Sequence, residues 1–205
     1  MAIITANNQS MTAITSLPSG VSAKSMILLA TETASDSATV SFTSGIDSTY
    51  KEYVFKFINM HPATDAVNFQ FQASTNTGSS YGVTNTSTAF TAYHQENGAD
   101  THFAYDTGAD EAQTTNFIRL NIGSNIGNGN DESFSGHLHL YNPSSTTFVK
   151  HWMCTGNFHD SSSTAFSVNP RTAGYFNTTT AIDAIQFKMH SGNIDAGTIK
   201  MYGVA

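Results

Sequence analysis

Two histidines at two-residue spacing are the first candidates for chemistry in this sequence. The segment HLH places His137 and His139 on one face of a strand, because side chains two residues apart point to the same side. With His151 or His159 from the following segment, three imidazoles could bind a metal ion such as zinc. No spacing fixes a third ligand, however. The favoured interpretation is that both histidines are outward polar positions alternating with leucines, and we predict no metal ligands.

Two loops carry clustered oxygen atoms of the kind that Ca²⁺ accepts. They are GNGNDES, residues 127–133, and DTGADE, residues 106–111. Neither has the strict acidic spacing and closing glutamate of an EF-hand. We therefore interpret both as solvated loops and expect no cofactor.

Residues for covalent or acid–base catalysis are scarce. The sequence has no Gly-x-Ser-x-Gly elbow, and its one cysteine, Cys154, lies in the apolar strand segment HWMCTG. This context predicts a buried, inert thiol. Most of the 15 acidic residues fall in loops, and no two are placed as the carboxylate pair that a glycosidase needs. The sequence therefore indicates a protein that is not an enzyme.

Aromatic residues in the expected loops are the best candidates for binding. Rigid β-sandwiches can stack aromatic side chains on the apolar faces of sugars, with hydrogen bonds from neighbouring polar groups. In the alternative interpretation, these aromatics cap the core or lie in subunit contacts. The candidate residues facing a glycan or a partner are Tyr81, Tyr93, His94, Tyr175 and Phe176.

Composition limits the class of protein. Only 11% of the 205 residues are charged, the net charge is −7, and lysine and arginine form no cluster in the sequence. Nucleic-acid binding normally needs a basic footprint, so we expect no nucleic acid as partner. The longest apolar run, residues 26–30, is far shorter than a membrane span. The start lacks the features of a signal peptide, and a lone cysteine is typical of a reducing compartment. We expect assembly in a cytoplasm, without membrane insertion.

The hydrophobic pattern has a period of two along most of the chain. Residues 25–33 and 38–44 alternate around ASDS and predict a hairpin, and residues 66–74 alternate most clearly. In the latter, Val67, Phe69 and Phe71 should point inward, whereas Asn68, Gln70 and Gln72 should point outward. About ten or eleven short strands separated by Gly, Asn and Ser turns predict an all-β sandwich or barrel. We assign residues 24–205 to one such domain and residues 1–23 to an extended arm.

The final segment, residues 184–205, predicts two more alternating strands. Gly192 and Gly197 bracket the loop between them, where positive φ is accessible to glycine at low cost. We expect this hairpin to close the sandwich, because a terminal strand is stable only when it is paired. The expected inward side chains are Ile185, Phe187, Met189, Ile199 and Met201.

Two segments resemble one family. TTTAIDAIQFKMHSGNIDAGTIKMYGVA, residues 178–205, resembles the C-terminus of many tailed-bacteriophage virion proteins. In these, an aI-x-x-I-x-F strand, an SGNI-x-x-G loop and a final LYG or MYG strand close a β-sandwich. Residues 50–81 are similar to the early hairpin of the same family, with a Y-x-x-Y strand, a Pat turn and an alternating strand. Thr77 and Gly78 stand where that family often has two glycines.

This resemblance implies an antiparallel jelly-roll-like β-sandwich that assembles into a virion. It implies a non-enzymatic tail-fibre, tail-tip or capsid-decoration protein, made in the bacterial host cytoplasm and associating with itself, commonly as a homotrimer, and with other virion proteins. The arm at residues 1–23 would dock on a neighbour. This role also allows a glycan on the host cell surface as a further partner. The alternatives are a lectin-like carbohydrate-binding module and, third, a polysaccharide depolymerase.

Overall fold

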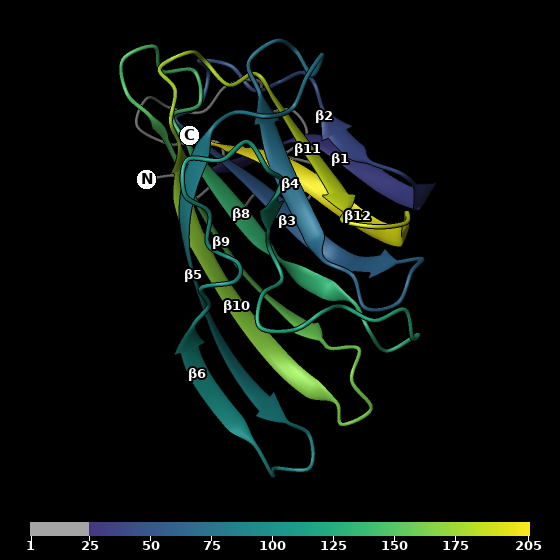
Figure 1. The fold of residues 1–205 in the computed structure, drawn as a ribbon. Coiled ribbons are helices and arrows are strands. Elements are labelled where there is room, and N and C mark those ends of the chain that lie inside the picture. The colour runs from purple at the N-terminus through teal and green to yellow at the C-terminus, as the bar shows by residue number, and fades with distance from the viewer. Residues whose placement is uncertain (1–24) are drawn as a thin grey trace, which may run out of the picture.

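The computed structural model describes residues 25–205, so the predicted arm at residues 1–23 lies outside the described residues. These residues form twelve strands in two antiparallel sheets (Figure 1) and contain no helix that could span a membrane. The large sheet has the order β1 (Met26–Ser37), β12 (Ile194–Val204), β3 (Glu52–Pro62), β8 (Phe134–Tyr141), β9 (Lys150–His159), β10 (Phe166–Phe176), β5 (Asn85–Gln95) and β6 (Thr101–Tyr105). The small sheet has the order β2 (Val40–Phe42), β11 (Ala184–Met189), β4 (Phe69–Ser74) and β7 (Ile118–Arg119).

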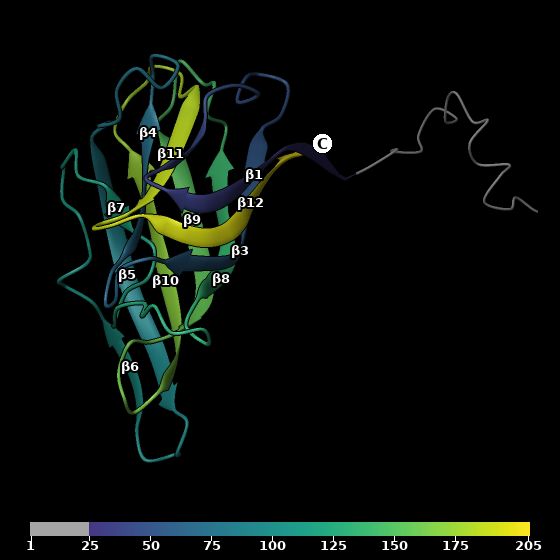
Figure 2. The same cartoon turned by 90° about the vertical axis from the view of Figure 1, so that its right-hand side faces the viewer.

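Eight of these strands form a jelly roll. The order β1-β12-β3-β8 in the large sheet is matched by β2-β11-β4-β7 in the small sheet, and each consecutive pair, such as β3 and β4, crosses between the sheets. The remaining strands are two insertions, β5–β6 and β9–β10, which extend the large sheet beyond the small one. In Figure 2, β6 lies at the end of the molecule farthest from β11 and β4. The predicted all-β, jelly-roll-like sandwich is confirmed.

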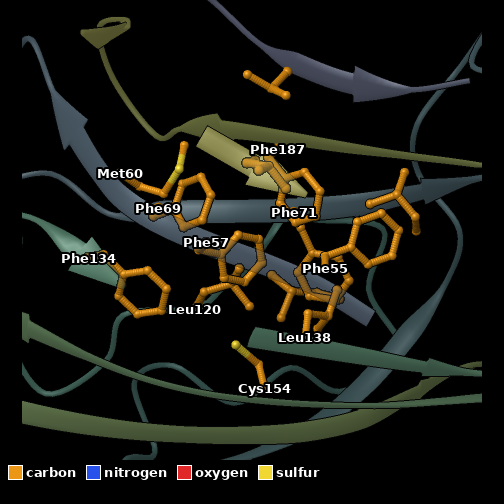
Figure 3. Close-up of a cluster of buried hydrophobic side chains, with 14 of the residues drawn as sticks. Phe55, Phe57, Met60, Phe69, Phe71, Leu120, Phe134, Leu138, Cys154 and Phe187 are labelled. Atoms are coloured by element: carbon orange, nitrogen blue, oxygen red, sulfur yellow. The ribbon is translucent and has the colours of Figure 1, made fainter. Parts of the chain in front are cut away.

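Phenylalanine rings fill the space between the sheets (Figure 3). Alternate residues of a strand share one face, so β3 directs Phe55 and Phe57 inward to meet Phe69 and Phe71 from β4. Phe187 from β11 lies among them, with its ring centroid 5.2 Å from that of Phe57 and 5.5 Å from that of Phe55. All five side chains are 2% exposed or less.

The predicted inward faces are confirmed, but two of the side chains expected to point outward are covered by other segments and are not exposed to solvent. Gln72 in β4 is fully buried, because the segment before β7 covers this face of the small sheet. Its side-chain amide donates hydrogen bonds to the carbonyl oxygens of Thr115 and Asn116, at 3.0 and 2.7 Å. Asn68 is 9% exposed and accepts a hydrogen bond at its side-chain oxygen from the Asn121 amide. These polar groups are tolerated inside because they have partners.

Neither predicted hairpin forms as a pair of bonded strands. β1 pairs with β12, whereas β2 pairs with β11 in the other sheet. β11 and β12 are likewise in different sheets, where β11 pairs with β2 and β4, and β12 pairs with β1 and β3. The alternation of β2 and β11 was predicted correctly, whereas β1 does not alternate regularly: its register against β12 shifts between Leu28 and Ala30, and Leu28 is 51% exposed. The strand partners were predicted wrongly in both cases, because each connection crosses the sandwich instead of turning back within a sheet.

Strand β10 continues past a proline. It continues through Pro170 to Phe176, although proline has no N–H to donate to the neighbouring strand. Two side-chain amides bridge the resulting gap between β10 and β9. The Asn169 amide donates to the Gly156 carbonyl at 2.6 Å, and the Asn157 amide donates to the Val168 carbonyl at 3.0 Å.

Both glycines have positive φ, as predicted, at +69° for Gly192 in the loop before β12 and +133° for Gly197. Gly197 does not bracket the loop as expected, because β12 already begins at Ile194. Gly197 sits where the register between β12 and β3 shifts. A Cβ atom there would lie 2.8 Å from the Asn59 carbonyl oxygen, so no larger residue fits without movement of the backbone.

Candidate functional site

The aromatic residues predicted to bind a ligand do not form one platform. Tyr93 points toward the core side of the large sheet, where its ring stacks on His102 at 5.1 Å and its hydroxyl donates to the Asp100 carboxylate at 3.3 Å. His94 is exposed on the opposite face of the same strand. The two neighbours in β5 therefore cannot act together.

The other three candidates are also separated. Phe176 is fully buried in the core, 5.9 Å from Phe71 between ring centroids, and has no surface to offer a ligand. The hydroxyl of Tyr81 is buried in the loop between β4 and β5. Tyr175 lies half-buried on the outer face of the large sheet, 6.1 Å from the His151 ring. Only Tyr175 borders the groove described below.

The oxygen-rich loops use their carboxylates internally. Glu132 accepts a hydrogen bond from the Gly129 backbone N–H at 2.5 Å, which closes its own loop. Asp106 accepts backbone N–H bonds from Gly108 and Gly123, both at 3.0 Å. Residues 25–205 contain no group of three or more His, Cys, Asp or Glu side chains that could hold a metal ion.

The histidine pair lies on the outer face of the large sheet, meaning the face turned away from the small sheet. The rings of His137 and His139 on β8 are 5.0 Å apart, and His139 Nδ1 is hydrogen-bonded to a carboxylate oxygen of Glu52 on β3. Cys154 points to the opposite side, into the core, and burial raises the pKa of its thiol. The predicted inert thiol matches this position.

A groove runs along the outer face over β9 and β10. Its floor is made by Met153 and Thr155 from β9 and by Ala173 from β10. One wall is β8 and the other is β5. The groove comprises two adjoining hollows of about 270 and 430 Å³, which share Tyr141, Met153 and Ala173. The walls carry His137, His139, Tyr141, Phe90 and Thr88.

Small residues in β10 shape the sheet at this groove. Ala173 lies on the floor, where a larger side chain would fill the groove, whereas Gly174 faces the core side of the sheet. At Gly174, an added Cβ atom would lie 2.4 Å from the Thr86 carbonyl oxygen and 2.7 Å from the buried Trp152 ring. Glycine at this position therefore lets β10 pack closely between β5 and the core tryptophan.

Large apolar side chains are exposed around the groove. Met153 is 54% exposed on its floor, and Phe90, Phe103 and Tyr105 form an exposed aromatic group at the β5–β6 end. The rings of Phe90 and Phe103 are 5.7 Å apart in an edge-to-face arrangement. Exposed apolar surface gathered in one place is typical of a binding surface.

Positive charge accompanies the aromatic residues. The pKa of His137 is lowered first by burial and then by His139, Lys56 and Arg171, so these groups lie close enough to act on one another. The residues that line the two hollows include no aspartate or glutamate. The groove thus combines aromatic faces, imidazoles and a guanidinium, a set suited to binding a ligand and without a carboxylate pair for hydrolysis.

The sequence held a signal for this site that loop-based reasoning missed. Residues 137, 139 and 141 alternate outward as His, His and Tyr, so two imidazoles and a phenol share one face of a strand. Comparison with known proteins adds nothing to this geometry: no family model, no curated protein and no solved structure matches the sequence.

Proposed function

We propose that this chain is a non-enzymatic structural protein of a tailed-phage particle, a tail-fibre, tail-tip or capsid-decoration subunit whose outer-face groove binds a host-surface glycan. One observation carries the virion part. The two segments that resemble phage virion proteins, residues 50–81 and 178–205, contribute β3, β4, β11 and β12. β3 pairs with β12 in the large sheet and β4 pairs with β11 in the small sheet.

The two segments that carry the resemblance therefore pack together at the centre of the jelly roll. Its core is made by Phe55, Phe57, Phe69, Phe71 and Phe187, all from these four strands. If this chain and the phage proteins share one structural unit, the sequence pattern that they share should fall on residues that pack together. Jelly rolls serve in viral shells and in lectins, so the fold agrees with this role by analogy.

The particle role is tested by composition and mass. Purified virions should contain the 21.9 kDa chain, and its copy number distinguishes a shell component, with hundreds of copies, from a tail appendage, with about a dozen. The isolated protein should form a homo-oligomer, which we expect to be a trimer, when its mass is measured by light scattering. A protein absent from virions and strictly monomeric would contradict the proposal.

The groove favours a second candidate function, a carbohydrate-binding module outside a virion. Glycan-array binding is expected in either case, and Phe90→Ala should weaken it while Phe148→Ala should not. Phe148 is a matched control because it is 68% exposed in the loop before β9 and lies outside the groove. The virion measurement separates the two functions. Incubation with host capsule or lipopolysaccharide should release no fragments, and any release would favour the depolymerase.

A further inference from the structure

One cross-strand row on the outer face gathers positive charge. Register pairs join Lys200 to Lys56, Lys56 to His137 and His137 to Thr155. They continue from Thr155 to Arg171, Phe90 and Tyr105. We call this set the basic row; its members are Lys200, Lys56, His137, Thr155, Arg171, Phe90 and Tyr105. At about 4.8 Å between strands, the row spans roughly 29 Å across seven strands.

The basic row concentrates charge in an acidic protein. The whole sequence has eight lysine and arginine residues and a net charge of −7, yet three of the eight lie in this row. Within residues 25–205, the only salt bridges formed with carboxylates involve histidines. The charges of Lys56 and Arg171 are therefore not neutralised by an acidic side chain, and they stand on the two sides of His137.

Aromatic groups accompany each part of the row. Phe90 and Tyr105 follow Arg171 in the register, and Lys56 Nζ lies 5.4 Å from the centroid of the Tyr202 ring. Cations next to exposed rings suit a ligand that has both acidic groups and apolar faces. Charged hydrogen bonds can hold the acidic groups, and the rings can stack on the apolar faces.

We propose that the basic row binds an acidic glycan, with sugar-borne carboxylate or phosphate groups held by Lys56, His137 and Arg171 and sugar faces packed on Phe90 and Tyr105. This inference rests on the glycan-binding part of the proposed function and names the class of glycan. A nucleic acid is disfavoured, because its affinity depends on neutralising many phosphates and this row offers two cations around one histidine, with Lys200 at its end.

The test is a glycan array that contains uronate-bearing and phosphate-bearing bacterial glycans beside neutral glycans of similar length. Acidic glycans should bind and neutral ones should not. Arg171→Gln should weaken binding by about 10- to 100-fold, the loss expected for one charged hydrogen bond. Arg119→Gln is the matched control, because Arg119 is exposed on β7 of the small sheet and carries the same charge. It should change affinity by less than about twofold.

Lys56→Gln and its control Lys188→Gln, on β11 of the small sheet, repeat the comparison with lysine. Binding to the acidic glycans should also weaken as NaCl rises from about 50 to about 500 mM, because salt screens exposed charges. Near-ultraviolet circular dichroism confirms that each variant is folded. The uronate and phosphate arms of the array identify which acidic group is bound.

Each other outcome overturns the inference in a recognisable way. Equal binding of neutral and acidic glycans would remove the role of the basic row and leave the proposed glycan-binding function standing. Loss of affinity in Arg119→Gln equal to that in Arg171→Gln would show an effect of net charge alone. Tighter binding of a thymidine oligonucleotide than of any acidic glycan would identify a nucleic-acid site. No binding to any glycan would contradict this inference and the glycan part of the proposed function together.

Discussion

Phe187 lies among the phenylalanine rings that fill the core of the sandwich. Its side chain is fully buried between the two sheets (Figure 3). Its ring centroid lies between 5.2 and 6.3 Å from those of five other phenylalanines, namely Phe42, Phe55, Phe57, Phe69 and Phe71. These five come from three strands, β2, β3 and β4, so Phe187 joins both sheets across the core.

Phe187→Ala should therefore lower the free energy of unfolding by about 4 to 5 kcal/mol. Removing a buried phenylalanine ring costs about 3 to 5 kcal/mol, since apolar contacts are lost and a cavity remains. The upper part of this range applies because the aromatic pairs are lost as well, and each contributes about 0.5 to 1.5 kcal/mol beyond its buried area. Domains are stable by only about 5 to 15 kcal/mol, so this one change removes a large share of the total.

The assay is urea unfolding followed by the fluorescence of Trp152. This is the only tryptophan of the sequence, it is fully buried, and its ring is 5.0 Å from Phe71 in the same core. With an unfolding slope near 2 kcal/mol per molar urea, the midpoint should fall by about 2 M. Phe148→Ala, which removes a 68% exposed ring, is the control and should change stability by less than about 0.5 kcal/mol.

A midpoint shift below about 0.5 M for Phe187→Ala, or equal shifts for the two variants, would refute the claim that this ring joins the two sheets. If Phe187→Ala does not fold at all, the result supports the prediction only when Phe187→Leu does fold. Leucine keeps much of the buried apolar volume, so that variant should show a smaller loss of stability than alanine.

Three further predictions concern other parts of the fold. Gly197→Ala should lower stability by at least about 2 kcal/mol, because it combines a φ of +133° with a clash. The control Gly98→Ala, at φ +75° in open space, should cost only about 1 kcal/mol, and equal losses in thermal melts would contradict this prediction. Cys154 should not react with a thiol reagent at pH 8 until the protein is unfolded, because burial raises its pKa, and rapid labelling of the native protein would show exposure. The pKa of His137 is lowered below its usual 6.5, so protonation favours the unfolded chain and stability should fall as the pH drops below about 6.5. His137→Gln should make this fall smaller in urea titrations at pH 7.5 and 5, and an unchanged pH dependence would rule out this contribution.

Local alternation in the sequence was enough to predict which side chains enter the core. Phe69 and Phe71, Phe187 and Met201 are buried as the period of two required. The partner of each strand could not be predicted in the same way. A strand's alternation records which face is buried and says nothing of which neighbour supplies its hydrogen bonds. This is why both expected hairpins, at residues 25–44 and 184–204, are crossings between sheets.

The burial of Gln72 could not be predicted from the sequence, for a related reason. Gln72 alternates with phenylalanines, so it was expected to face solvent. The segment that covers it lies more than 40 positions along the chain, at Thr115 and Asn116. Such coverage by a distant loop leaves no trace in the pattern of the strand itself, and only the hydrogen bonds to the two carbonyls explain why a glutamine is tolerated there.

The outer-face groove shows the same limit at the level of function. The outward positions of His137 and His139 were predicted correctly, and each alone has the character of an ordinary solvated residue. Lys56 and Arg171 lie 81 positions before and 34 positions after His137. Strand register alone brings these three into one row beside Phe90. A binding site built across strands is therefore specified by the pairing that sequence patterns leave undetermined, and its chemistry becomes visible only when the order of strands in the sheet is known.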